Sequence, residues 1–230
     1  MTSGPLVAFL LVGRDAIQKV RCLAGDQDPG VAKLQQPGSL RAIYGNDFVT
    51  NAVQISESPA CVEKDAALFF TTCRTALPLL APGTALMTCS TCCVIKPHAV
   101  KEGVAGSIID CITRANYKIT AFELFYLDRT HAEEFYEIYK GVIPEYSDMT
   151  EELSLGPCYV LEISGCGEDT PASFREFVGP MNPIIAKKLR PTSIRAKFGT
   201  STVKNAVHCT DLCLDAEMEV DYFFRILQML

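Results

Sequence analysis

The feature that most constrains the fold of this chain is an internal repeat. Arg21 recurs as Arg175, and eleven further identities keep the same spacing of 154 positions. Register agreement of this length marks a duplicated module. The other pairs are Gly25 and Gly179, Pro29 and Pro183, Ala32 and Ala186, Pro37 and Pro191, Arg41 and Arg195, Gly45 and Gly199, Asn51 and Asn205, Ala52 and Ala206, Val53 and Val207, Phe69 and Phe223, and Phe70 and Phe224. Gly4-Pro5 and Gly156-Pro157 match at 152 positions, which places a two-residue insertion after the next strand.

The repeat also sets the domain organisation. Residues 1–70 recur, whereas residues 89–153 have no earlier counterpart. The sequence therefore predicts a complete module over 89–230, preceded over 1–70 by the C-terminal half of a first copy. Met1 is then an internal position or a truncated boundary. Residues 71–88 contain Pro78, Pro82 and Gly83 with little periodicity, which is typical of a linker.

Composition excludes several classes of protein. A chain with 48% hydrophobic and 21% charged residues is neither a disordered tail nor a collagen-like rod. A net charge of −6 argues against nucleic acid as the main partner. Apolar runs such as Leu6 to Val12 are far shorter than the ~20 residues that cross a bilayer, so we expect a cytoplasmic protein without a membrane partner. Of the eleven cysteines, Cys111, Cys158 and Cys209 lie in apolar stretches, which favours reduced buried thiols over a disulfide framework.

The second copy alternates strand and helix patterns. Apolar runs predict strands over 92–95, 118–127, 158–163 and 205–209. Helices are expected over 104–116, from a capping box of Thr130 and Glu133 to Gly141, from Thr170 to Gly179, from Asn182 to Arg190, and near the C-terminus. Because strands and helices alternate with short connections, the pattern predicts a ferredoxin-like, split βαβ α/β sandwich.

One histidine is a candidate nucleophile. His208 ends an apolar strand, and the polar start of a helix, Thr210-Asp211, follows directly. An imidazole that is largely neutral at pH 7 can attack phosphorus, and Glu219 lies on the next helix, where it can orient the ring. The alternative is a strand-end histidine satisfied by the backbone. No P-loop and no G-x-G-x-x-G turn is present, so a nucleotide would be held in another way. Cys89-x-x-Cys92 is half of a zinc or redox motif, but no second pair has the right spacing, and no metal ligand is predicted.

Several stretches together resemble one known family. They are Lys96-Pro97, the helix with Tyr136, Gly156-Pro157, the Arg-Pro-x-x-x-Arg stretch from Arg190 to Arg195, and Asn205-Ala206-Val207-His208. Over residues 91–228 the chain resembles the nucleoside diphosphate kinase family, and in detail its tandem-module, ciliary members. The resemblance implies the nucleoside diphosphate kinase fold.

The resemblance also implies roles for individual residues. His208 matches the histidine that is transiently phosphorylated, and Glu219 matches the acid that hydrogen-bonds to it. Lys96 is expected to act in catalysis as well as in binding. The expected contacts to phosphate or ribose come from Lys96, Tyr136, Arg175, Arg195, Asn205 and Thr210. Magnesium would accompany the nucleotide.

Departures from the family pattern weaken the expected nucleotide site. His98 replaces the aspartate of Lys-Pro-Asp, Met181 replaces a phosphate-binding threonine, and Cys209 replaces a glycine. Residues 141–144 lack the phenylalanine that stacks on the base. Each lost contact should cost about 1 kcal/mol or more in binding. In the first copy Gln54 stands where the second has His208, and Gln54 cannot accept a phosphoryl group.

Two functional hypotheses follow. The first is a structural and interaction protein of ciliary doublet microtubules, with tubulin and axonemal or γ-tubulin complex proteins as partners, and with weak or vestigial phosphotransfer. The second is an active kinase that exchanges the terminal phosphate between nucleoside tri- and diphosphates. The resemblance alone implies the cytoskeleton, the ciliary axoneme and the centrosome as locations.

Overall fold

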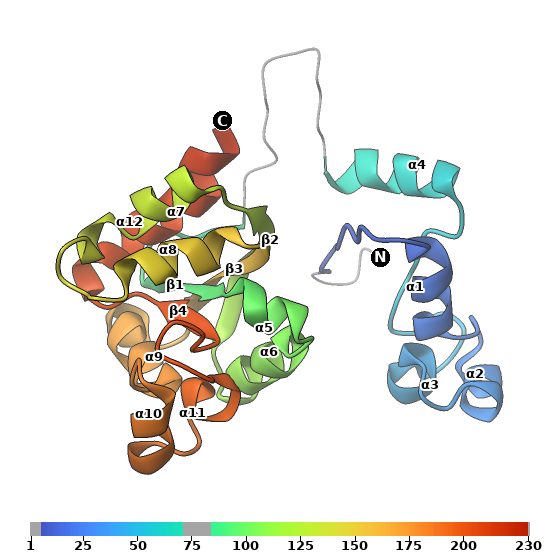
Figure 1. The fold of residues 1–230 in the computed structure, drawn as a ribbon. Coiled ribbons are helices and arrows are strands. Elements are labelled where there is room, and N and C mark those ends of the chain that lie inside the picture. The colour runs from blue at the N-terminus through green and yellow to red at the C-terminus, as the bar shows by residue number, and fades with distance from the viewer. Residues whose placement is uncertain (1–5, 71–83, 230) are drawn as a thin grey trace. The chain divides into compact units, whose positions relative to one another are not determined.

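The computed structural model describes residues 6–70 and 84–229, which belong to two compact units, Met1–Pro82 and Gly83–Leu230 (Figure 1). The boundary between the units falls within the predicted linker, of which residues 71–83 lie outside the described residues. Among the residues described, no helix is long and apolar enough to span a membrane.

A four-stranded sheet forms the centre of the second unit. Its strands are β1 (Ser90–Ile95), β2 (Lys118–Tyr126), β3 (Pro157–Ser164) and β4 (Val207–Cys209). They lie in the order β2-β3-β1-β4, and every neighbouring pair is antiparallel. This order confirms the predicted ferredoxin-like sandwich. β4 is shorter than predicted because Ala206, with φ 73°, leaves the extended conformation.

Helices cover both faces of this sheet, since alternate strand residues point to opposite sides. Cys92 and Val94 of β1 pack in a core with α7, α8 and α12 (Figure 1), whereas Cys93 and Ile95 pack in a second core with α5, α6, α9 and α11. The helices and turns are α5 (Pro97–Lys101), α6 (Ala105–Arg114), α7 (Arg129–Phe135), η1 (Glu137–Tyr139), α8 (Tyr146–Ser154), η2 (Gly167–Asp169), α9 (Thr170–Val178), α10 (Pro183–Leu189), α11 (Ile194–Phe198), η3 (Cys213–Asp215), α12 (Ala216–Asp221), the π-helical turn η4 (Tyr222–Ile226) and η5 (Leu227–Met229).

The start of α7 corrects one sequence prediction. The side chain that caps this helix is Asp128, which accepts a hydrogen bond from the backbone N–H of His131 at 2.9 Å. Thr130 and Glu133 therefore do not form the predicted capping box, and Glu133 instead pairs with Arg129 at 2.7 Å. An aspartate two residues after a strand is an equally good cap, so the helix begins one residue before Thr130. The helix also ends earlier than predicted, and α8 was not predicted.

The first unit repeats three helices of the second. It contains α1 (Ala16–Ala24), α2 (Pro29–Gln35), α3 (Leu40–Tyr44) and α4 (Pro59–Phe69). Both ends of α1, α2 and α3 fall 154 positions before the ends of α9, α10 and α11. Arg41 donates to the carbonyls of Gly25 and Val53, and Arg195 donates to those of Gly179 and Val207. The duplicated sequence thus folds twice into the same local structure.

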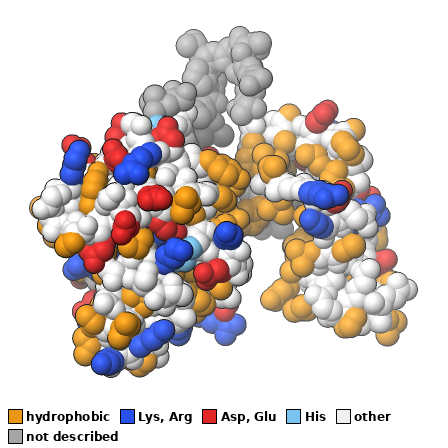
Figure 2. All heavy atoms as spheres, viewed as in Figure 1, with side chains coloured by type: hydrophobic (Ala, Val, Ile, Leu, Met, Phe, Trp, Pro, Cys, Tyr) orange, Lys and Arg blue, Asp and Glu red, His pale blue; other side chains and the backbone are white. Residues whose placement is uncertain are grey.

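The first unit has no strand among its described residues. Residues 6–12 match β3 in sequence, yet the side chains of Phe9 and Leu11 are 65% and 58% exposed, whereas their counterparts Leu161 and Ile163 are fully buried. In the second unit, β1 and β2 pair with β3 and cover its edges, and residues 1–70 contain no counterpart of either strand. Hydrophobic side chains are consequently spread over the visible face of the first unit (Figure 2).

Candidate functional site

The predicted nucleophile and its predicted acid are in direct contact. His208 lies on β4 with its side chain buried, and its Nε2 is 3.0 Å from Oε2 of Glu219 on α12. The hydroxyl of Thr210 donates to the same oxygen at 2.8 Å. Because the carboxylate accepts from Nε2–H, the neutral ring keeps its lone pair on Nδ1. The arrangement therefore presents Nδ1 as the nucleophilic nitrogen.

An aromatic wall surrounds the imidazole. The ring centroids of Phe135, Tyr136 and Tyr139 lie 5.0, 5.6 and 6.4 Å from that of His208. Tyr136 is fully buried, its hydroxyl has no hydrogen-bond partner in the described part of the chain, and burial raises its pKa. A protonated, unpaired hydroxyl beside the nucleophile is a ready donor to a phosphate oxygen. The sequence prediction for Tyr136 thus has a physical basis.

Lys96 follows β1 and is almost completely buried. Its ammonium donates to the carbonyl of Val203 at 2.9 Å, and burial lowers its pKa to about 8. Nearby Glu152 opposes this shift, so Lys96 remains mainly protonated at neutral pH. Lys96 therefore supplies a buried positive charge at the end of β1.

Asp211 is a site residue that sequence reasoning passed over. Its carboxylate accepts from the hydroxyl of Tyr139 at 2.7 Å and pairs with Arg175 Nε at 2.9 Å. Burial raises its pKa, but the hydroxyl of Tyr139 and the charge of Arg175 outweigh burial and lower it overall. The available signal was the polar Thr210-Asp211 start after the strand. Asp211 links Arg175 on α9 to the aromatic wall.

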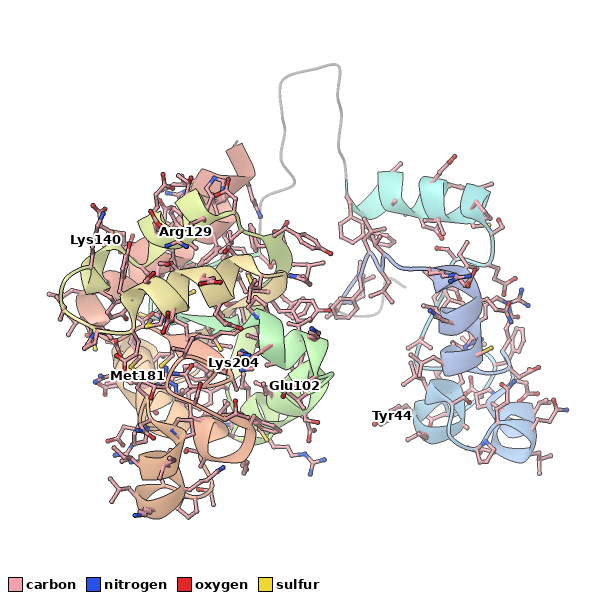
Figure 3. The ribbon with its side chains drawn as sticks, viewed as in Figure 1. Tyr44, Glu102, Arg129, Lys140, Met181 and Lys204 are labelled. Carbon is pink, nitrogen blue, oxygen red and sulfur yellow. The ribbon has the colours of Figure 1, made fainter. Side chains whose placement is uncertain are left out.

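Two other predicted contacts are engaged by the protein itself. Within the described residues, the buried Arg195 donates three hydrogen bonds, all to backbone carbonyls at 2.9 to 3.3 Å. The Nδ2 of Asn205 donates to the carbonyl of Met181 at 3.2 Å, while its Oδ1 is buried without a partner among the residues described. Figure 3 labels Met181, in the segment before α10, and Lys204, in the segment before β4. The hydrogen bond from Asn205 to Met181 connects these two segments. A role for Arg195 toward nucleotide remains a prediction.

The first unit keeps the scaffold of this site but lacks its nucleophile. Ser56 donates to Asp65 at 2.7 Å, which repeats the contact of Thr210 with Glu219 at a shift of 154 positions. Gln54 stands in the place of His208 and is exposed. The described part of the chain contains no cluster of three or more His, Cys, Asp or Glu that could hold a metal ion.

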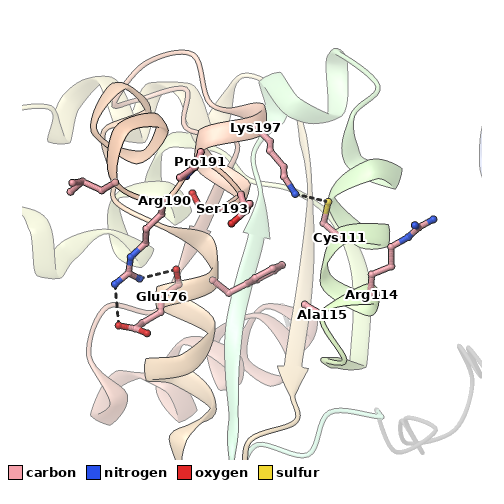
Figure 4. Close-up of a pocket in the computed structure, with 11 residues that line it drawn as sticks. Cys111, Arg114, Ala115, Glu176, Arg190, Pro191, Ser193 and Lys197 are labelled. Atoms are coloured by element: carbon pink, nitrogen blue, oxygen red, sulfur yellow. Dashed lines mark hydrogen bonds and ion pairs between the residues drawn. The ribbon is translucent and has the colours of Figure 1, made fainter.

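A cavity of about 540 Å³ lies elsewhere in the second unit, between α6, α9 and the segment 189–197 (Figure 4). None of the predicted site residues lines it. Arg190 donates there to the backbone and side chain of Glu176, and Lys197 Nζ lies 4.0 Å from Cys111 Sγ.

Comparison with known proteins assigns the family. The family model for nucleoside diphosphate kinase matches residues 1–75 and 90–229. Nucleoside diphosphate kinase homolog 7 of Rattus norvegicus is 45% identical over 228 residues, which are 99% of this chain and 56% of the relative. The chain thus spans just over half the length of this relative.

Solved structures of two members of this family superpose on the chain. A crystal structure of the Aquifex aeolicus nucleoside diphosphate kinase superposes with a TM-score of 0.56 at 33% identity, and covers 60% of this chain and 96% of its own. That of Encephalitozoon cuniculi superposes with a TM-score of 0.53 at 27% identity, and covers 59% of this chain and 88% of its own. The fold, the geometry around His208 and these matches lead to one conclusion: this chain belongs to the nucleoside diphosphate kinase family.

Proposed function

We propose that the second unit transfers a phosphoryl group from a nucleoside triphosphate to a nucleoside diphosphate through a phosphohistidine at His208, with low efficiency. The observation that carries this proposal is the contact of Nε2 of His208 with Glu219, which Thr210 braces. This contact leaves Nδ1 as the attacking atom.

In the first half-reaction Nδ1 attacks the γ-phosphorus, the P–N bond forms, and the bond to the bridging oxygen of the β-phosphate breaks. The nucleoside diphosphate leaves with that electron pair. A second diphosphate then attacks the phosphohistidine by the reverse of this step. Positive charge grows on the ring as Nδ1 bonds to phosphorus, and the Glu219 carboxylate stabilises it through Nε2–H.

The cations and the free hydroxyl serve the transferring group. Lys96 and Arg175 can balance the charge on its oxygens, and the unpaired hydroxyl of Tyr136 can donate to one of them. Magnesium, which enters with the nucleotide, neutralises charge on the β- and γ-phosphates. Arg175 must first leave Asp211, and Lys96 must leave or share the carbonyl of Val203. These rearrangements cost binding energy.

Low efficiency is expected from the binding contacts that the sequence lacks. Met181 offers no hydroxyl to a phosphate, and residues 141–144 offer no aromatic ring to a base. If each loss costs about 1 kcal/mol, KM rises on the order of 30-fold, whereas the chemical step at His208 is retained.

The test is intact-mass measurement of the full chain after incubation with millimolar ATP and magnesium. We expect an acid-labile gain of one phosphoryl group that is absent in His208→Gln. The matched control is His131→Gln, since His131 is a partly exposed histidine on α7. A folded parent protein that gains no phosphoryl group, or a His208→Gln variant that still gains one, would refute the proposal.

We also propose a structural role for the whole chain, in ciliary doublet microtubules, with tubulin and axonemal or γ-tubulin complex proteins as partners. Support comes from the first unit, which repeats the fold of α9 to α11 and carries Gln54 in place of a nucleophile. A module retained without its reactive group is suited to contact rather than to catalysis. His208→Ala should then enter axonemes as well as the parent does, and failure of this folded variant to enter would count against the role.

A further inference from the structure

We infer that His98 is a positioning residue for His208, which acts through the backbone N–H of Ala206; this inference rests on the proposed phosphotransfer. His98 lies in the first turn of α5 and is 8% exposed. Its Nε2 accepts a hydrogen bond from the N–H of Ala206 at 3.2 Å. Its Nδ1 lies 2.7 Å from Oε1 of the buried Glu152 on α8, and its own backbone N–H donates to the same oxygen at 3.1 Å.

These partners fix one tautomer of His98. A backbone N–H can only donate, so Nε2 must carry a lone pair. Nδ1 therefore carries the proton and donates it to Glu152. The ring is neutral and is held at both nitrogens, which connects α8 to the residue that enters β4. The charged groups around this segment include the carboxylate of Glu152, the ammonium of Lys96 and the guanidinium of Arg195. Glu152 raises the pKa of Lys96, whereas burial, which has the larger effect, and Arg195 lower it.

The segment 96–98 holds Ala206 on both sides. The N–H of Lys96 donates to the carbonyl of Ala206 at 3.0 Å, while His98 accepts from the N–H of Ala206. Ala206 comes two residues before His208, and β4 is only three residues long. Its ladder with β1 ends at the pair of Ile95 and Val207. The two bonds to Ala206 therefore attach the residue that precedes a short edge strand, two positions before the nucleophile.

The first unit shows that the turn at Ala206 does not need the hydrogen bond to His98 in order to form. Ala52, the counterpart of Ala206, has φ 72° although its N–H makes no hydrogen bond to any described residue. The left-handed turn is thus formed locally, by the Asn-Ala-Val segment and the arginine that binds it. What His98 adds is the connection of this turn to β1 and α5. Loss of that connection would let β4 shift relative to Glu219, and a shift of about 1 Å costs ~10²-fold in rate.

Two substitutions distinguish this role from general stability. His98→Asn keeps a donor near the position of Nδ1, toward Glu152, but removes the acceptor for Ala206. His98→Gln places an amide oxygen near the position of Nε2 and keeps that acceptor, but loses the donor to Glu152. Each variant loses one buried hydrogen bond, so we expect their melting temperatures to be similar.

The measurement is the rate of His208 phosphorylation in the full chain by phosphoramidate, a phosphoryl donor without base or ribose. We expect His98→Asn to slow this reaction about tenfold or more and His98→Gln to slow it far less. In the parent, imidazole ¹⁵N shifts should show His98 protonated on Nδ1 and bare on Nε2. In His98→Asn the ¹⁵N shifts of His208 should move, and in His98→Gln they should not.

Equal slowing in both variants, no slowing in either, unmoved His208 shifts in His98→Asn, or a proton on Nε2 of His98 would overturn the inference. If phosphoramidate but not ATP phosphorylates the parent, the proposed function fails while the inference is still tested by the two variants. If neither donor phosphorylates the parent, the ¹⁵N shifts of His208 decide the inference alone.

Discussion

Glu162→Gln should destabilise the second unit strongly, although the two side chains have nearly the same shape. The side chain of Glu162, near the C-terminal end of β3, is fully buried and accepts four hydrogen bonds. The donors are the backbone N–H groups of Leu86 and Met87, each at 2.7 Å, and the hydroxyls of Ser90 and Thr120, each at 2.6 Å. Leu86 and Met87 lie in the predicted linker, so this carboxylate anchors its end.

The magnitude follows from the donors. A glutamine has one acceptor oxygen, which can serve Met87 and Ser90, while its NH₂ then faces Leu86 and Thr120. The hydroxyl of Thr120 can rotate and accept, but the N–H of Leu86 cannot. One buried donor left unpaired costs about 1–3 kcal/mol, and each bond changed from charged to neutral costs about 1 kcal/mol more. Relief of the buried charge offsets part of this, so we expect a net loss of about 3 kcal/mol.

Strain in the anchored segment adds to the reason for this loss. Met87 and Cys89 both have positive φ, 63° and 53°, which is unfavourable for residues with a side chain. Such conformations persist only where surrounding bonds enforce them, and the carboxylate of Glu162 binds the N–H of Met87 directly. Weaker anchoring should release this segment first.

The assay is urea unfolding of the full chain followed by the tyrosine signal, because seven of the eight tyrosines lie in the second unit and the eighth is Tyr44. The matched control is Glu168→Gln, since Glu168 is an exposed acid shortly after β3. If Glu162→Gln unfolds within about 1 kcal/mol of Glu168→Gln, the four bonds do not anchor the segment and the reasoning is refuted.

Three further predictions concern thiols, pH and the first unit. In the native chain, a thiol reagent at pH 8 should label the exposed cysteines, which are Cys22, Cys61, Cys89, Cys166 and Cys213. It should spare Cys92, Cys93, Cys158 and Cys209, because these are buried and burial raises their pKa values. Mass mapping of the labelled peptides checks this, and labelling of Cys92 before unfolding would contradict it. Burial lowers the pKa of Lys96 from 10.5 to about 8, so the unfolded chain holds this proton more tightly and stability from Lys96 grows as pH rises from 8 to 10.5. The unfolding free energy of the parent relative to Lys96→Met should thus increase by ~3 kcal/mol over this range, and a difference independent of pH would show that Lys96 is not desolvated. Residues 1–70 alone should show no cooperative thermal transition by circular dichroism, because Phe9 and Leu11 have no strand to cover them; a sharp monomeric melt would disprove this.

Local signals predicted most of the fold. A proline in the first turn marks the starts of α9 and α10, and Gly179, with φ 88°, marks the end of α9. Apolar runs predicted the four strands, because such a run is a local property of neighbouring residues. The start of β4 could not be predicted, because Ala206 takes a left-handed conformation that its own side chain does not favour.

The contact of His208 with Glu219 was predicted because the two residues are close in sequence, whereas contacts that join distant segments, such as that of Arg175 with Asp211, were missed. His208, Thr210 and Glu219 lie within one strand and the next helix, so their contact follows from the topology. His98 and Glu152 are 54 residues apart and meet only through the packing of α5 on α8. The hydrogen bonds of Arg195 to backbone carbonyls could not be predicted either, because the sequence shows a guanidinium but not which acceptors surround it.

Arg41 and Arg195 bind corresponding carbonyls in the two units, and this recurrence affects how the activity of a duplicated module can be judged from its residues. Arg41 and Arg195, Asn51 and Asn205, and the hydroxyl–carboxylate pairs behind them all recur. These side chains hold the same local structure in both units, so their presence does not distinguish a copy with a nucleophile from a copy without one. A search for conserved-looking polar residues alone would therefore find part of the site in the first unit as well. Among the positions that both copies contain, the difference that bears on the proposed phosphotransfer is Gln54 in place of His208.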